Sequence, residues 1–182
     1  MKQQFSFASL RNVLAGLGLA LAPLAGLAQA PAWQSVLTPQ QVGTARSAVG
    51  RTAADAAGNV YMLGTFSGTI SLGSSTLTSQ GADDVFLAKW SPSRQAFGWV
   101  QQLGGPGADQ ATDLAVHGPN VYVTGIFRSA SLPVGGTTLT NTGEPGSSDV
   151  FVLKMTNQGT SASLDWVEQA GGNDNELGAT LA

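Results

Sequence analysis

The sequence contains no cysteine and few charged residues: its 182 residues include 8 Lys+Arg, 11 Asp+Glu and one histidine. The missing cysteine excludes disulfides, a thiol for lipidation, a catalytic thiol and a thiolate metal site. Charged residues make up 10% of the chain, against about 25% in ordinary soluble domains. A net charge of −3 and 42% hydrophobic residues exclude charge-driven disorder. Eight scattered cations also exclude a basic face for nucleic acid.

Residues 1–30 are typical of a secretory signal peptide. Arg11 precedes an apolar run over residues 13–28, and an Ala-Gln-Ala sequence predicts cleavage after Ala30. Cleavage after Ala32 is the alternative, because proline directly follows Ala30. A membrane anchor is disfavoured, since the run is short, rich in Gly and Ala and interrupted by proline. We therefore expect an exported protein, secreted or at the cell surface, with no transmembrane segment after cleavage.

The remaining sequence repeats itself. Four blocks recur in the same order, and their offsets grow from 61 to 67 residues. This pattern indicates a duplicated unit whose loops took small insertions. The pairs are GNVYMLGTF (58–66) and PNVYVTGIF (119–127), GSSTLTS (73–79) and GGTTLTN (135–141), DVFLAKW (84–90) and DVFVLKM (149–155), and WVQQLGG (99–105) and WVEQAGG (166–172).

Each block is predicted to be a strand, because it is rich in β-branched and aromatic residues and is bounded by turn clusters. The glycine inside the first block of each unit predicts a close approach of two backbones. Four short strands per unit describe a β-meander. The predicted divisions are a signal peptide over 1–30, a degenerate lead-in over 31–54, a first unit over 55–118 and a second unit over 119–182.

Repeated four-stranded units cover their faces by stacking radially into a propeller, which agrees with the low charge. The blocks D-x-x-G-N-V-Y, T-L-T-S, D-V-F-L-A-K and W-x-x-x-x-G-G over residues 55–182 resemble the bacterial β-propeller repeat family often called SBBP. The resemblance implies an exported propeller of about seven blades, commonly without an assigned activity. We predict an all-β chain that forms an incomplete β-propeller of about two four-stranded antiparallel blades.

Two interpretations of the blade number stay open, because a closed propeller needs about four to eight blades. Either the chain is a fragment of a longer product, or three or four copies assemble into one ring through open blade faces. Trp33 stands where Trp99 and Trp166 stand in their units, so residues 31–54 are interpreted as the decayed end of a preceding unit.

Four aspartates are candidates for chemistry. Asp84 and Asp149 each open the third predicted strand and would suit a cation or acid–base catalysis. Their presence in both units favours a structural role, in which each accepts backbone N–H groups from the preceding turn. Asp109 and Asp113, in the predicted loop after the fourth strand, would suit glycoside hydrolysis at the right separation. The second unit does not keep this pair, which disfavours catalysis.

Asp174 and Glu176 form the densest acidic spot and are the weak metal candidates, for calcium, which prefers six to eight oxygens. They lack a D-x-D-x-D-G ladder, so we expect a solvated loop and predict no metal and no cofactor. His117, the only histidine, is predicted to be a turn residue. Trp99 and Trp166 would stack on sugars, but their recurrence at one position favours packing.

The sequence thus predicts a non-enzymatic, exported propeller segment that gives a rigid surface for binding an unknown protein or glycan, as in adhesion. No catalytic residue is assigned. The alternative is part of a carbohydrate-active propeller enzyme, a hydrolase or lyase, whose catalytic blade lies outside this chain.

Overall fold

The computed structural model describes residues 39–178 and 180–181, so the predicted signal peptide, both cleavage sites and Trp33 lie outside the described residues. The described part of the chain contains eleven strands and no helix, and every strand pairing is antiparallel. The predicted all-β class is therefore confirmed. The sheets are open at both edges and do not close on themselves.

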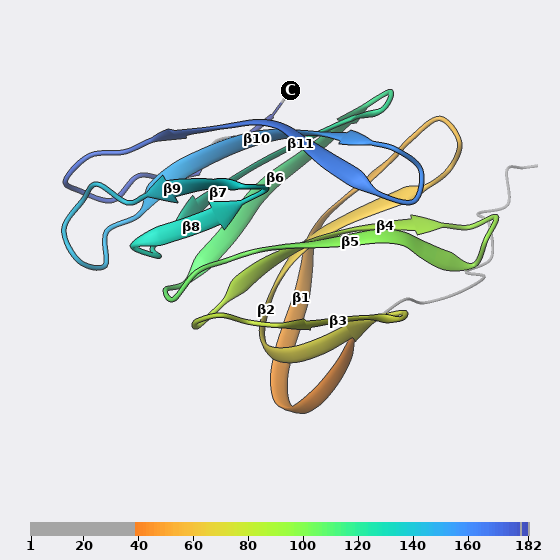
Figure 1. Ribbon diagram of the computed structural model, residues 1–182, viewed down its shortest axis with the longest axis horizontal. Coiled ribbons are helices and arrows are strands. Elements are labelled where there is room, and N and C mark those ends of the chain that lie inside the picture. Colours follow the sequence, from red (N-terminus) through yellow and green to blue (C-terminus); the bar gives the residue numbers. More distant parts are fainter. Residues whose placement is uncertain (1–38, 179, 182) are drawn as a thin grey trace, which may run out of the picture. The chain divides into compact units, whose positions relative to one another are not determined.

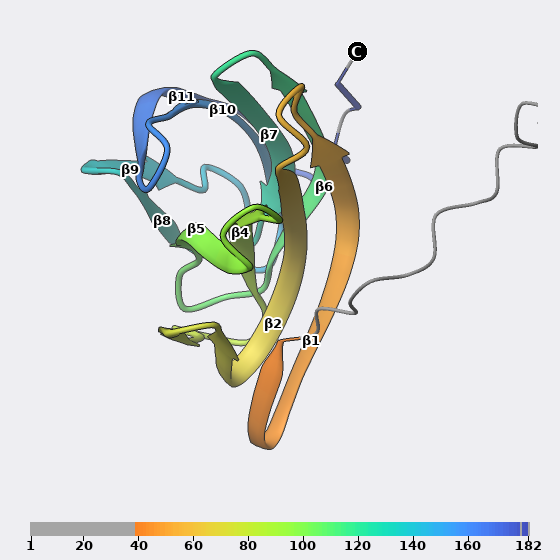
Figure 2. The same ribbon diagram turned by 90° about the vertical axis from the view of Figure 1, so that its right-hand side faces the viewer.

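The first sheet uses residues 40–103 and has the strand order β1-β2-β4-β5, with β3 paired to the end of β2. Figure 2 shows β1 and β2 as long, bent strands. The strands are β1 (Gln40–Ala54), β2 (Val60–Leu72), β3 (Ser75–Thr78), β4 (Asp84–Ser91) and β5 (Ala96–Leu103).

The second sheet uses residues 109–170 and has the strand order β6-β7-β10-β11, the order of the first sheet with β6 in the place of β1 (Figure 1). A separate hairpin of β8 and β9 corresponds to the end of β2 and to β3. The strands are β6 (Asp109–His117), β7 (Asn120–Phe127), β8 (Ser131–Val134), β9 (Thr137–Thr140), β10 (Asp149–Asn157) and β11 (Ala162–Ala170).

Two strands escaped the sequence prediction. β6 lies in the predicted loop after the fourth strand, so that local prediction was wrong, and β1 lies in residues 31–54, where no strand was predicted. Both strands are rich in Ala and polar residues, and β1 also contains two glycines. They form because β2 and β7 supply long-range ladders. The predicted Thr-rich strands do form, as β3 and β9, but they lie off the four-strand paths.

The same local irregularities occur in both sheets. A register shift interrupts the pairing of β1 with β2 between Val49 and Arg51, and the pairing of β6 with β7 between Ala111 and Asp113. A β-bulge of this kind bends the strand at a defined point. The two sheets therefore share strand order and also the place where their first strand bends.

The predicted close approach at one glycine of each sheet is confirmed. A Cβ at Gly64 would overlap a carbonyl of β1 and the ring of Phe86, and a Cβ at Gly125 would overlap a carbonyl of β6 and the ring of Phe151. No larger residue fits, because the phenylalanine ring of the neighbouring strand lies directly on the glycine.

The hydrophobic core packs the two sheets together. One face of β2, β4 and β5 contributes alternating buried side chains, and β7, β8, β9 and β10 contribute the opposing ones. The first set is Tyr61, Leu63, Val85, Leu87, Trp99 and Leu103; the second is Val121, Val123, Phe127, Leu132, Val134, Leu139, Phe151, Leu153 and Met155.

One glutamine ties each small hairpin to the last strand of its sheet. The Gln102 amide of β5 donates to the Thr78 carbonyl of β3 at 2.8 Å. The Gln169 amide of β11 donates to the Thr140 carbonyl of β9 at 2.8 Å and accepts the Thr140 N–H at 3.1 Å. β3 and β9 thus contact the outermost strands through side chains, without a backbone ladder.

Candidate functional site

Each sheet carries a row of tyrosine, lysine and tryptophan across three neighbouring strands. In the first sheet Tyr61 pairs with Lys89, and Lys89 pairs with Trp99. We call these three residues the inner row. All three are buried, with exposures of 0%, 5% and 6%. The rings of Tyr61 and Trp99 meet edge to face, with centroids 5.9 Å apart, and the ammonium of Lys89 lies 6.0 Å from the Tyr61 ring.

The inner row is held by a turn of the second sheet. The side-chain oxygen of Asn157, at the end of β10, accepts the indole N–H of Trp99 at 3.0 Å and the ammonium of Lys89 at 3.1 Å. The carbonyl of Gly159 accepts the same ammonium at 3.3 Å. A buried ammonium is tolerated only when its donors are satisfied, so this turn is what permits Lys89 to be buried.

Burial also changes the acidity of Tyr61. Desolvation, together with the nearby Asp55 carboxylate, raises the pKa of Tyr61 to about 12. The Tyr61 hydroxyl donates to Asp55 at 3.2 Å. The phenol therefore stays protonated throughout the physiological range and acts as a packing group.

The second sheet carries an outer row of the same residue types: Tyr122 pairs with Lys154, and Lys154 pairs with Trp166. It lies on the face of the sheet turned away from the core, because Leu153 and Met155, the neighbours of Lys154, face the core. Trp166 is 41% exposed. Its ring still meets that of Tyr122, with centroids 6.5 Å apart. The outer row is therefore built like the inner row but faces solvent.

A carboxylate takes the place of the missing turn in the outer row. Asp165 binds the ammonium of Lys154 at 2.8 Å and accepts the hydroxyl of Thr156 at 2.8 Å. The hydrogen bond to Asp165 raises the pKa of Lys154, and the same contact lowers the pKa of Asp165. The outer row thus presents an exposed indole beside an ion pair.

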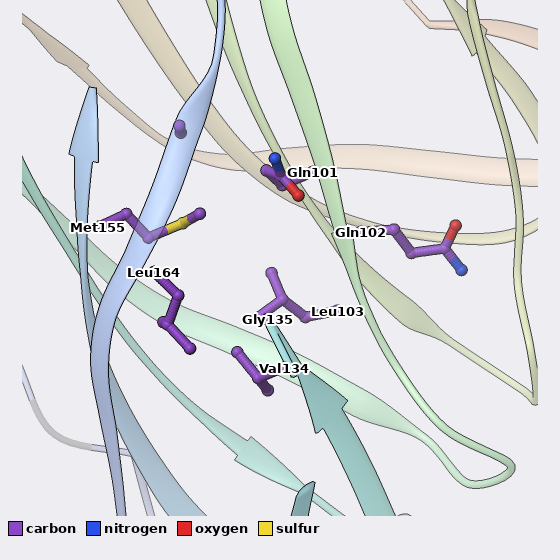
Figure 3. A pocket seen from close by; sticks show the side chains of 8 residues that line it. Gln101, Gln102, Leu103, Val134, Gly135, Met155 and Leu164 are labelled. Carbon is purple, nitrogen blue, oxygen red and sulfur yellow. The ribbon is translucent and has the colours of Figure 1, made fainter. Parts of the chain in front are cut away.

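A small cavity marks the seam where the last residues of β5 meet the second sheet. Leu103 of β5, Val134 of β8 and Leu164 of β11 point toward one another around it (Figure 3). Its volume is about 80 Å³, well below the 300–1,000 Å³ typical of a small-molecule site. This space is a packing gap between sheets.

The predicted structural role of Asp84 and Asp149 is confirmed. Both are fully buried at the start of their strands. Asp84 accepts the N–H of Gln80 at 3.0 Å, and Asp149 accepts the N–H of Thr142 at 3.1 Å. Burial raises the pKa of Asp84, and its hydrogen bonds oppose the increase.

Asp109 and Asp113 have separate partners. Asp109 is buried in β6 and accepts N–H groups of Gly105, Arg128 and Ser129 at 2.8 to 3.2 Å. Its carboxylate also accepts the Ser129 hydroxyl at 2.7 Å, so it fastens the start of β6.

Asp113 faces the C-terminal segment instead. It accepts the N–H of Leu181 at 2.8 Å and lies 3.4 Å from the guanidinium of Arg51. The N–H groups of Leu181 and Leu114 and the nearby Arg51 lower the pKa of Asp113. The two aspartates thus have separate sets of donors, and each holds two segments of the fold together.

The calcium candidates lie in the segment after β11. Asp174 is exposed, and Glu176 is half-buried with its N–H donating to the Ser148 carbonyl at 2.8 Å. Among the described residues, no group of three or more His, Cys, Asp or Glu side chains gathers to hold a metal. His117 ends β6 directly before its turn and is exposed.

Sequence reasoning noted Trp166 but missed the rest of the outer row. Tyr122 and Lys154 stand inside blocks that repeat Tyr61 and Lys89, so they looked like packing residues. One difference between the two units could have revealed the outer row: Asp165 precedes Trp166, whereas Gly98 precedes Trp99.

The chain matches no protein-family model and no curated protein. The resemblance to the SBBP repeat therefore stays a prediction. In the part of the chain that the structure covers, no helix has the length and apolar character needed to cross a membrane.

Proposed function

We propose that the two sheets are neighbouring blades of an exported β-propeller of the SBBP type, and that the chain is a non-enzymatic binding module. Three shared features support the propeller: the strand order, the bulge in the first strand, and the tyrosine–lysine–tryptophan row. Two sheets are fewer than the four to eight blades of a closed propeller. The remaining blades come from a longer polypeptide or from other copies.

The outer row is the binding surface of this module, and its partner is a glycan or a protein. A further blade, from a longer polypeptide or from another copy, is one such protein. One observation carries this proposal: Trp166 is 41% exposed, while its counterpart Trp99 is 6% exposed. Exposed tryptophan and tyrosine on a rigid sheet are enriched at interaction sites, because they offer large contact area at little entropic cost. The ion pair of Lys154 with Asp165 beside the rings adds polar recognition.

Binding to cell envelopes and to insoluble polysaccharides tests this function with the chain from residue 31 onward. We expect the chain to bind at least one of these surfaces or to associate with itself. Trp166→Ala should weaken that binding at least tenfold. Leu177→Ala, which truncates a side chain that is 86% exposed elsewhere, is the matched control and leaves binding unchanged. Cleavage of a polysaccharide by the full-length gene product would instead support the carbohydrate-active enzyme whose catalytic blade lies outside this chain.

Export is tested separately by N-terminal sequencing of the protein recovered outside the cytoplasm. We expect a mature end at residue 31 or 33, as signal-peptidase cleavage after Ala30 or Ala32 predicts. A mature protein that retains residues 1–30 contradicts the proposed export.

A further inference from the structure

We propose that the outer face of the second sheet binds the β4–β5 turn of a second copy of this chain, head to tail. The proposal rests on the proposed function, because it names the protein partner of the outer row. It follows from a comparison of three places: the contact that covers the inner row, the outer face of the second sheet, and the β4–β5 turn of the first sheet.

The observed contact between the sheets needs a small residue at one point. β5 has an extra residue, Gly98, between Trp99 and Phe97. A Cβ at Gly98 would lie 3.0 Å from the carbonyl of Gly159, which is tight. The turn over residues 157–159 therefore approaches β5 closely, and brings its carbonyl and amide oxygens to Lys89 and Trp99.

The outer face does not fit another turn of this kind. The bulged residue of β11 is Asp165, in the place of Gly98. The Asp165 carboxylate already binds the Lys154 ammonium at 2.8 Å, so an incoming turn that presents oxygens finds no free ammonium there. Glu168, which is exposed, adds a second negative charge where the first sheet has Gln101. The partner of this face must therefore present positive charge.

The first sheet of the same chain has such a turn. At the position of Asn157, the β4–β5 turn over residues 91–95 has Pro92, which offers no amide oxygen. It carries Arg94, which is exposed and takes part in no ion pair among the described residues. An acidic change on one free face and a basic change on the opposite free turn are complementary, as expected when one binds the other.

The cavities beside the two turns agree with this pairing. Next to Gly135 and Met155 of the second sheet, residues Gln101–Leu103 of the first sheet fill the space and leave a cavity of about 80 Å³. The corresponding space of the first sheet, lined by Gly73, Trp90 and Phe97, is a cavity of about 250 Å³. In the proposed contact, residues 168–170 of the second copy's β11 fill this space, as Gln101–Leu103 fill the other.

The contact joins two different surfaces, so it is heterologous and leaves each copy with one free surface of each kind. Such contacts generate a ring when the rotation closes and a filament when it does not. The proposal therefore predicts concentration-dependent association that ends in a closed ring or continues as a filament.

Sedimentation velocity of the chain from residue 31 onward, between 1 and about 200 μM at low salt, tests the contact. We expect concentration-dependent association that weakens about tenfold in Arg94→Glu and about tenfold in Glu168→Arg, since each places like charges together. The double variant Arg94→Glu/Glu168→Arg restores association, because it exchanges the two charges. Arg46→Glu, the same charge change at an exposed site on β1, the edge strand opposite β5, is the control and has no effect.

The outcomes separate the proposal from the proposed function. A monomer at all concentrations overturns the proposal, as does weakening by Glu168→Arg without weakening by Arg94→Glu. A monomer that binds a polysaccharide through Trp166 overturns the second copy as partner but leaves the proposed function standing. A monomer without any Trp166-dependent binding overturns both.

Discussion

The inner and outer rows have the same three residue types in the same register, yet one is a structural element and the other a surface. The inner row is buried because Asn157 satisfies its donors. The outer row keeps its ring contact, but its lysine is satisfied by Asp165 within its own sheet. The comparison teaches that the residue next to a motif decides its surroundings: Gly98 admits the turn of a neighbouring sheet, and Asp165 binds the lysine of its own sheet.

The largest expected difference is between the two tryptophans. Trp99→Ala removes a buried indole and should lower the free energy of unfolding by about 3–5 kcal/mol. Trp166→Ala removes a half-solvated one and should cost about 1 kcal/mol or less. Urea unfolding of the purified variants measures both, and equal losses would break the distinction between the rows.

The next largest effect is expected at the acceptor of the inner row. Asn157→Ala leaves the Lys89 ammonium and the Trp99 indole without their shared acceptor and should cost about 2–3 kcal/mol. The matched change in the outer row, Asp165→Asn, should lower the urea midpoint much less, because Asp165 is exposed and water replaces its contact with Lys154. A midpoint that falls in Asp165→Asn but not in Asn157→Ala would reverse the assignment of the rows.

A third prediction concerns a contact that both sheets share, between a glycine after the last strand and the buried aspartate. A Cβ at Gly104 would overlap the Asp84 carboxylate, and one at Gly171 would overlap that of Asp149. Gly104→Ala and Gly171→Ala should therefore each cost about 2 kcal/mol in urea unfolding. Gly172→Ala, where the nearest atom is the flexible Glu176 side chain at 3.4 Å, is the control, and its midpoint should match that of the unmodified chain.

The smallest effects are expected in acid titration. Burial raises the pKa of Asp84, so the native state holds this proton more tightly than the unfolded chain. Its contribution to stability is therefore fully present below pH 3.8 and decreases as the pH rises through the folded pKa. Lys154 lowers the pKa of Asp165, so that contribution is present above pH 3.8 and decreases as the pH falls through the folded pKa.

Carbon-13 NMR of the side-chain carboxyl groups measures the two titrations directly. We expect Asp84 to titrate above 3.8 and Asp165 below it. In Lys154→Met the Asp165 midpoint should move up toward 3.8, and the Asp84 midpoint should stay in place. An Asp165 midpoint that ignores this substitution would show that the outer ion pair does not form in solution.

The sequence predicted those parts of the fold that depend on local composition. The blocks around Phe86, Tyr122 and Phe151 form strands as expected, since β-branched and aromatic residues fill them. β1 and β6 were missed because their Ala, Gly and polar residues become strands only when β2 and β7 pair with them.

The candidate site was predicted less well than the strands. Asp84 and Asp149 were recognised because a structural aspartate needs only its own turn. The different exposures of Trp99 and Trp166 depend on whether a neighbouring sheet is present. Two identical residues in similar blocks cannot carry that information, so it becomes visible only in three dimensions.

The glutamine ties of the small hairpins bear on how such a sheet changes length over evolution. Between the Thr-rich blocks and the blocks that open with Asp84 and Asp149, the offset grows from 62 to 65 residues. The added residues lie in the connection that follows β9, whose hairpin is tied to β11 through Gln169 instead of through a continuous ladder. An insertion there shifts no backbone register, so the hairpin gives the architecture a place where loops lengthen without cost to the strands.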